Sequence, residues 1–200
     1  MRSAEVVQVA DWIVSSKDNK GQPFAILDKR DARLFVFLDG GVLVGSAPVL
    51  LGQAKGDDTV PGIGDRPIAD VKPFERTTPA GRFVVEHGSN TRGEDVIWID
   101  YDAAISMHPV LTTNPAEHRL ERLQSANQED HRISYGCVNV PKAFFEDVVL
   151  KTLHVPHPVV YVMPETKALG NVFTGFPNGE SAEDRSGQVA KSGARSEGKT

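Results

Sequence analysis

Apolar residues recur with helical spacing near the start of the chain. Val6, Val9 and Ile13 repeat at intervals of three or four positions. Ser3 precedes them and is a residue type that accepts a hydrogen bond from the first turn of a helix. This pattern predicts a short amphipathic helix that ends near Ser16.

Most other apolar residues lie in short segments rich in β-branched and aromatic side chains, which are typical of strands. Two of these segments flank Asp39-Gly40-Gly41, and this glycine turn predicts a β-hairpin. Around Trp98 the side chains alternate, as they do in a strand that lines a core. The predicted strands are 24–28, 33–38, 42–51, 82–87, 95–107 and 159–163.

Two later segments carry helix signals. Asn114 precedes Pro115, and Glu117 follows within the first turn, a combination that predicts a helix N-terminus. We expect this helix to end near Ser125. Residues 141–153 also space their apolar side chains helically.

Residues 52–82 contain five glycines and four prolines, which predicts a long functional loop rather than regular structure. The charged residues Asp57, Asp58 and Arg66 in this loop have two open interpretations, substrate contact or simple solvation.

These elements predict a mainly β protein with a few helices and one packed domain. Residues 1–22 would form the N-terminal helix and loop, and residues 23–164 the domain. Residues 165–200 carry five basic and five acidic side chains and few large apolar ones after Phe176. Because so little apolar surface cannot offset the entropy cost of ordering, we expect a disordered tail over 165–200.

Charge and cysteine content narrow the function. The chain has 22 basic and 27 acidic residues, a net charge of -5, which argues against a nucleic-acid partner. Apolar runs are too short to predict a membrane span, and residues 1–16 show no export-signal pattern. A single cysteine, Cys137, excludes an intrachain disulfide and a multi-thiolate metal site. Metal-binding and nucleotide-binding motifs are also absent, so we expect no metal and no cofactor.

Cys137 stands in a sequence that suits a nucleophile. Gly136 would let a substrate carbonyl approach the backbone, and the amides of Gly136 and Cys137 are candidate donors to an oxyanion. A nearby imidazolium or helix N-terminus would lower the pKa of the thiol. His108, at the end of the predicted 95–107 strand, is a candidate base. The alternative is a buried packing cysteine, the more frequent role of a lone thiol.

Three separated segments resemble the catalytic domain of the L,D-transpeptidases, the YkuD-type family. Residues 24–52 resemble its opening strand and hairpin, and residues 77–83 its Thr-Pro-x-Gly-x-Phe segment. Residues 134–139 resemble its Ser-His-Gly-Cys-hydrophobic-Asn/Arg signature. The segments keep the family's order and span roughly residues 23–163. The resemblance implies a β-sandwich-like fold and a cysteine acyltransferase.

In this family the cysteine attacks the peptide bond after a diaminopimelate residue of a peptidoglycan stem, releases D-alanine and forms an acyl-enzyme. An amine of a second stem, a lipoprotein lysine or water then resolves it. The resemblance implies stem tetrapeptides as partners, cell-wall biogenesis and cell shape as the process, and the periplasm or cell wall as the location. It assigns catalytic roles to Cys137, His108, Ser134 and Gly136, and substrate contacts to Tyr135 and Asn139.

Two features depart from the family's pattern. Tyr135 replaces the usual histidine, and tyrosine cannot supply an imidazolium. The 25 residues between His108 and Ser134 exceed the family's usual interval, whereas His118 leaves 15. His118 would face away from the apolar side of its helix, so we favour His108 and an inserted helix over His118 and His131.

Two alternative functions stay open. One is a catalytically weakened or inactive relative that only binds peptidoglycan. The other is an L,D-carboxypeptidase or another cysteine amidase.

Overall fold

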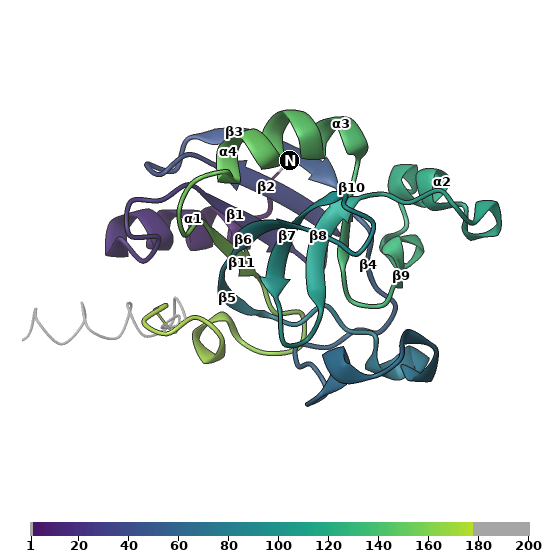
Figure 1. Cartoon of the computed structure of the whole chain (residues 1–200). Coiled ribbons are helices and arrows are strands. Elements are labelled where there is room, and N and C mark those ends of the chain that lie inside the picture. The colour runs from purple at the N-terminus through teal and green to yellow at the C-terminus, as the bar shows by residue number, and fades with distance from the viewer. Residues whose placement is uncertain (1, 178–200) are drawn as a thin grey trace, which may run out of the picture.

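The protein consists mainly of β-strands with a few helices, and the structure, a computed structural model, describes residues 2–177 (Figure 1). The larger sheet has the strand order β3-β2-β1-β11-β5. Its neighbouring strands are antiparallel, except for the parallel pair β1 and β11. The five strands are β1 (Phe24–Asp28), β2 (Arg33–Phe37), β3 (Leu43–Pro48), β5 (Gly81–Val84) and β11 (Val159–Val162).

A second sheet has the order β10-β8-β7-β6, in which β10 and β8 are parallel. Two short strands, β4 and β9, form a separate parallel pair. A bridge between Leu50 and Asn139 connects the chain before β4 to β10. The six strands are β4 (Leu51–Gly52), β6 (Glu86–Ser89), β7 (Asp95–Asp100), β8 (Ile105–Pro109), β9 (Arg132–Ser134) and β10 (Val138–Val140).

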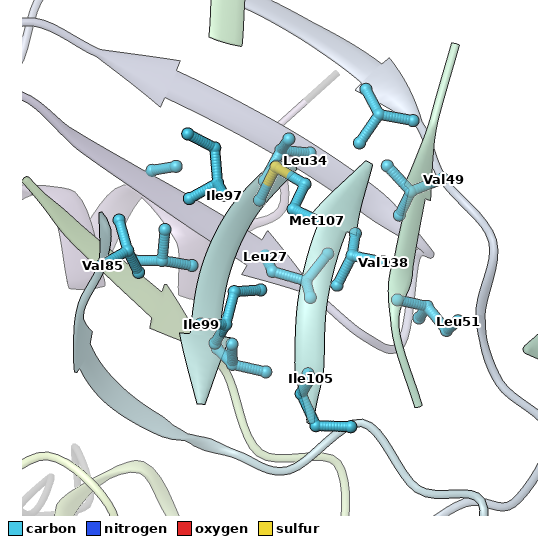
Figure 2. Packing of buried hydrophobic residues seen from close by; sticks show 14 of the residues in the cluster. Leu27, Leu34, Val49, Leu51, Val85, Ile97, Ile99, Ile105, Met107 and Val138 are labelled. Carbon is cyan, nitrogen blue, oxygen red and sulfur yellow. The ribbon is translucent and has the colours of Figure 1, made fainter. Parts of the chain in front are cut away.

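The two sheets face each other across the main hydrophobic core. Figure 2 shows Leu27 and Leu34 of the larger sheet close to Met107 and Val138 of the smaller one. All five residues of β1 are buried, because alternate side chains face the smaller sheet and the opposite layer. This two-sided burial explains why β1 is apolar almost throughout instead of alternating. The fold is therefore a β-sandwich with one further layer.

That further layer contains helix α1 (Ala4–Ser16). The side chain of Ser3 accepts a hydrogen bond from Val6 N at 3.3 Å, which confirms the predicted N-cap. The apolar face of α1 packs on the outer face of β1, β2 and β11 in a second core. Among the described residues, no helix is both long and apolar enough to cross a bilayer.

Residues 165–177 also belong to this layer, which corrects the prediction of a tail that is disordered from residue 165. They include the 3-10 helix η7 (Leu169–Asn171), and Phe173 is only 1% exposed. Its ring stacks on Trp12 of α1 with centroids 5.9 Å apart. The predicted tail over 178–200 lies outside the described residues.

The predicted strand 95–107 is instead a hairpin of β7 and β8. Asp100 Oδ1 accepts a hydrogen bond from Ala103 N at 3.0 Å, and Ala104 takes a left-handed conformation with φ 54°. This side-chain-capped turn competes with continued strand structure. Because of the turn, His108 lies on a strand that begins only at Ile105.

The predicted 114–125 helix is broken at His118, whose φ is 49°. Asn114 does cap its start, by accepting from Ala116 N at 3.2 Å, but only a 3-10 turn follows, η4 (Pro115–Glu117). Helix α2 (Arg119–Gln124) begins after His118. The 3-10 turn η5 (Gln128–His131) then leads into β9.

Other helical elements are short. The predicted 141–153 helix comprises α3 (Lys142–Phe144), the π-helical turn η6 (Phe145–Val149) and α4 (Leu150–Leu153), and Figure 1 shows it across one end of the sandwich. The loop 52–82 holds three 3-10 turns, η1 (Ile63–Asp65), η2 (Ile68–Asp70) and η3 (Pro73–Glu75).

Candidate active site

The parallel pairing of β8 with β10 brings the two main sequence candidates together. In this register Met107 is opposite Val138 and His108 is opposite Asn139. Cys137, which immediately precedes β10, therefore lies beside the middle of β8. The 25 residues between His108 and Ser134 are more than the family usually has. This long connection does not disturb the pairing of β8 with β10.

Cys137 and His108 shift each other's pKa, while the hydrogen-bond geometry of the thiol places Sγ 3.7 Å from the Ala104 carbonyl oxygen. Burial of Cys137 is the largest influence and opposes its ionisation, but the contributions of His108 and Ser106 together lower the pKa of the thiol. Burial likewise opposes a charged His108, yet the contact with Cys137 raises the pKa of the imidazole. The two shifts favour a thiolate beside an imidazolium, which is the ionisation state of an activated cysteine nucleophile.

The other contacts of His108 fix its ring. Nδ1 lies 2.8 Å from the carbonyl oxygen of Pro109, and Nε2 lies 3.3 Å from Asn139 Nδ2. Because a carbonyl only accepts, this network assigns the proton of the neutral ring to Nδ1 and leaves Nε2 as the basic nitrogen. In this arrangement Nε2 accepts from Asn139 Nδ2, so it can receive the thiol proton only when that hydrogen bond opens.

Asn139 supports the base and is too buried to touch a substrate directly. It is 1% exposed, and its Oδ1 accepts from Arg119 Nη1, which orients the amide so that Nδ2 faces His108. The sequence resemblance had assigned Asn139 to substrate contact. Arg119 comes from α2, so the inserted segment contributes to the site.

Ser106 contacts the thiol and was missed in the sequence analysis. Its backbone N lies 3.5 Å and its Oγ 3.7 Å from Cys137 Sγ, and both contacts help to lower the pKa of the thiol. Strand alternation was the available signal, because residues two apart in β8, such as Ser106 and His108, point to the same face.

The turn before Cys137 is closed by Ser134. Ser134 Oγ donates to the Cys137 carbonyl oxygen at 2.6 Å and accepts from Gly136 N at 3.1 Å. Gly136 has φ 129°, and a Cβ at this position would lie 2.5 Å from a methyl carbon of Ile105. Glycine is therefore required here. The Gly136 N–H already donates to Ser134 Oγ. Of the two predicted oxyanion donors, the Cys137 N–H is therefore the one that makes no hydrogen bond within this turn.

Tyr135 precedes Cys137 by two residues and is 37% exposed. The Arg76 guanidinium carbon lies 3.8 Å from the centroid of the Tyr135 ring, a cation–π contact. Arg76 is held in turn by Gln53 Oε1 at 3.0 Å and by the Val71 carbonyl. The glycine-rich loop therefore holds the ring of Tyr135 through Arg76.

The alternative bases have other partners. His118 is exposed and lies 2.8 Å from Glu121 Oε2. His131 is buried, with its ring nitrogens 2.9 Å from the Val49 carbonyl and 3.2 Å from the Ser125 carbonyl. Among the residues that the structure describes, His108 is the histidine that shifts the pKa of Cys137.

The structure shows that Asp57 of the 52–82 loop has a structural role, which neither of the two interpretations of this residue had included. It is buried, pairs with Lys29 Nζ at 2.7 Å and accepts from the backbone of residues 165–167. It is therefore neither solvated nor available to a substrate. Asp58 is exposed and pairs with Lys167.

A cavity of about 350 Å³ opens beside His108. His108 is one of its lining residues, whereas Cys137 is not, so the cavity reaches the site next to the imidazole. Its size is within the range of small-molecule sites. The charged and hydroxyl side chains among its lining residues are Glu94, Asp95, Thr112, Thr113, Lys142 and Glu146.

A scan against models of protein families finds no match for this chain. A search among curated proteins also finds no match. Solved structures similar to it include L,D-transpeptidases and a cell-shape protein. An L,D-transpeptidase from Xylanimonas cellulosilytica is 15% identical, with a TM-score of 0.42, over 71% of this chain and 60% of that one.

The second is the helical cell shape determining protein Pgp2 from Campylobacter jejuni, which is 15% identical with a TM-score of 0.46, over 80% of this chain and 57% of that one. The third, an L,D-transpeptidase from Mycobacterium smegmatis, is 13% identical with a TM-score of 0.40, over 71% and 58%. This chain thus spans less than two thirds of each of those chains. At these identities the chemistry must be inferred from the site itself.

Proposed function

We propose that this protein is a cysteine acyltransferase that acts on peptidoglycan stem tetrapeptides, as L,D-transpeptidases do. The observation that carries the proposal is the parallel pairing of β8 with β10, which brings Cys137 beside the strand of His108, where the pKa of the thiol is lowered and that of the imidazole is raised. The substrate class rests on the resemblance of residues 77–83 and 134–139 to that family. We place the activity with its substrate, in the periplasm or cell wall.

In the proposed reaction, His108 Nε2 takes the thiol proton and Cys137 Sγ attacks the carbonyl carbon of the diaminopimelate residue, in its peptide bond to the terminal D-alanine. The Cys137 N–H donates to the oxyanion. The C–N bond then breaks, and His108 returns the proton to the D-alanine amine as it leaves. A thioester remains on Cys137, and the cavity beside His108 provides space for the peptide.

The second half of the reaction releases the acyl group. An amine of another stem attacks the thioester carbon, His108 accepts the amine proton, and the C–S bond breaks to form the new amide. The Cys137 sulfur leaves as a thiolate and regains its proton from His108. Water in place of the amine would give the carboxypeptidase outcome from the same acyl-enzyme.

Intact-protein mass spectrometry after incubation with a carbapenem tests this proposal. We expect a single adduct on the wild-type protein and none on Cys137→Ala. His108→Ala should lose most of the adduct, whereas the matched control His118→Ala should keep it. A folded wild-type protein that forms no adduct, and whose thiol also resists iodoacetamide, would favour the relative that only binds peptidoglycan.

A further inference from the structure

Thr78 lies directly beneath the turn that carries Cys137. It is 1% exposed, and its Oγ1 donates to the Gly136 carbonyl oxygen at 2.8 Å. Thr78 Oγ1 also accepts a hydrogen bond from Gly52 N at 2.9 Å. This one hydroxyl therefore joins β4, the loop 52–82 and the Cys137 turn, and both its donor and its acceptor capacity are used.

A buried ion pair holds the backbone of Thr78 in place. Lys29 Nζ donates to the Thr78 carbonyl oxygen at 2.9 Å, while it pairs with Asp57 at 2.7 Å. The side chains of Lys29 and Asp57 have no exposed surface. The Thr78 hydroxyl is thus presented to Gly136 by a rigid part of the protein interior.

The hydrogen bond to Gly136 also determines the direction of the next amide. The carbonyl of Gly136 and the N–H of Cys137 belong to one planar trans peptide unit, so they point in opposite directions. Because Thr78 holds the carbonyl toward the interior, the Cys137 N–H points away from Thr78. The Gly136 N–H is occupied by Ser134 Oγ, so the orientation of the Cys137 N–H decides whether the turn can bind an oxyanion.

We propose that Thr78 is a positioning residue for acyl transfer: its hydroxyl fixes the Gly136–Cys137 peptide so that the Cys137 N–H can donate to the oxyanion formed at Cys137. This inference rests on the proposed function for its acyl-transfer chemistry, but not for the identity of the acyl donor. It assigns a role to the threonine of the Thr-Pro segment that is separate from the Cys137–His108 pair.

Two reactions at the same sulfur separate this role from a structural one. In acylation by p-nitrophenyl acetate, Cys137 Sγ forms a bond to the carbonyl carbon of the acetyl group, which gives a tetrahedral oxyanion. The ester C–O bond of this intermediate then breaks and p-nitrophenolate leaves. In alkylation by iodoacetamide, the sulfur displaces iodide and no oxyanion forms. Both reactions need the thiolate, whereas acylation alone needs the oxyanion donor.

The variants are Thr78→Val, which keeps the side-chain shape, and Thr78→Ser, which keeps the hydroxyl. Thr77→Val is the matched control, because the Thr77 hydroxyl bonds to the Asp58 carbonyl at 2.6 Å and not to the Cys137 turn. Thermal unfolding verifies that each variant is folded. If Thr78→Val does not fold, Thr78→Ala takes its place.

We expect Thr78→Val to slow acylation by about 10- to 100-fold, since loss of an oxyanion donor outright costs more. Alkylation should stay within about 2-fold of wild type with the same pH midpoint, because the Cys137–His108 contact is retained. Thr78→Ser should restore acylation to within about 3-fold, and Thr77→Val should leave both rates near those of wild type.

Three results would overturn the role of Thr78: normal acylation by a folded Thr78→Val, an equal loss of acylation and alkylation, or a wild-type protein that the ester does not acylate. A different result addresses the proposed function. If the ester acylates wild type and Thr78→Val shows the selective loss, but a stem tetrapeptide gives no acyl-enzyme, the role of Thr78 stands and the peptidoglycan substrate fails.

Discussion

Among the neighbours that favour the Cys137 thiolate, His108 has the largest effect on the pKa of the thiol. Because the contact with His108 lowers the pKa of the thiol, the wild-type protein should react with iodoacetamide at lower pH than an ordinary thiol does. In His108→Gln the thiol loses this partner, so its pKa should rise and the curve of alkylation rate against pH should move to higher pH. The measurement is the alkylation rate of Cys137 across the pH range in which thiols ionise.

His118→Gln is the matched control for this shift, because His118 contacts Glu121 and not the thiol. Its alkylation curve should coincide with that of wild type. Identical curves for wild type and His108→Gln would contradict the role of His108.

Ser106 should contribute less than His108, because Ser106→Ala removes the hydroxyl and keeps the backbone N–H that also faces the sulfur. A hydrogen bond of this kind is worth about 1 kcal/mol, so we expect acylation by a carbapenem to slow by roughly 5-fold. Stopped-flow acylation rates at saturating carbapenem would measure this. A loss as large as that in His108→Ala would mean that Ser106 takes part in proton transfer.

The sequence was sufficient to select Cys137 and His108 as candidates, because a glycine-cysteine turn and a histidine at a strand end are local features. Counting residues favoured His118, and no local pattern states that Ser106 contacts the thiol. Both points depend on which strand pairs with β10. That pairing is a long-range contact, so it becomes visible only in the folded chain.

At the scale of elements, local pattern predicted the type of most segments and failed at their interruptions. The hairpin turn after Asp100 and the break at His118 depend on left-handed residues, Ala104 and His118, that are not glycine. Apolar periodicity carries no information about such residues. The glycines and prolines of residues 52–82 predicted a loop, but no local pattern predicted that Asp57 within it would be buried against Lys29.

Asp57 anchors this loop, and its replacement should destabilise the protein. Burial opposes ionisation of Asp57, but the hydrogen bonds from Lys29 and from residues 165–166 dominate and lower the pKa of the carboxyl group. Asp57→Asn removes the hydrogen-bonded charge partner of buried Lys29 and leaves it only the longer ion pair with Glu165 at 3.6 Å, so we expect the free energy of unfolding to fall by about 3 kcal/mol at neutral pH. Urea denaturation measures this change.

The pH dependence follows from the lowered pKa of Asp57. Its stabilisation is fully present above the pKa that the group has in the unfolded chain, and it is lost as pH falls through the lower folded pKa. The stability difference between wild type and Asp57→Asn should therefore be constant near neutral pH and shrink in acid. Asp58→Asn is the matched control at an exposed site and should change stability little. A comparable loss in both variants would contradict the assignment of Asp57 as the anchor.

At the scale of the whole molecule, two cores share the larger sheet. The second core depends on α1 and residues 165–177, two segments from opposite ends of the described chain. Composition alone suggested a disordered tail from residue 165, because Phe173 and Leu169 are few and scattered. They are nevertheless sufficient, since the aromatic side chains of α1 and β11 provide the surface on which they pack.

Phe173→Ala tests this second core. Truncation of a buried phenylalanine costs about 3–5 kcal/mol, so the variant should unfold at a markedly lower temperature and urea concentration. Phe74→Ala removes the same side chain at a position that is 76% exposed, and its stability should stay close to that of wild type. Equal stability of both variants would show that residues 165–177 do not support the fold.

The parallel pairing of β8 with β10 has a consequence for how such a site is recognised in a sequence. His108 lies on β8 and Cys137 immediately precedes β10, and the chain between them leaves the sheet and returns. The distance between His108 and Cys137 is therefore set by the strand register and does not depend on the length of that connection. The connection can lengthen or shorten over evolution without separating the two residues. A search that demands a fixed number of residues between histidine and cysteine would discard such a chain, whereas one that asks which two strands are partners would retain it.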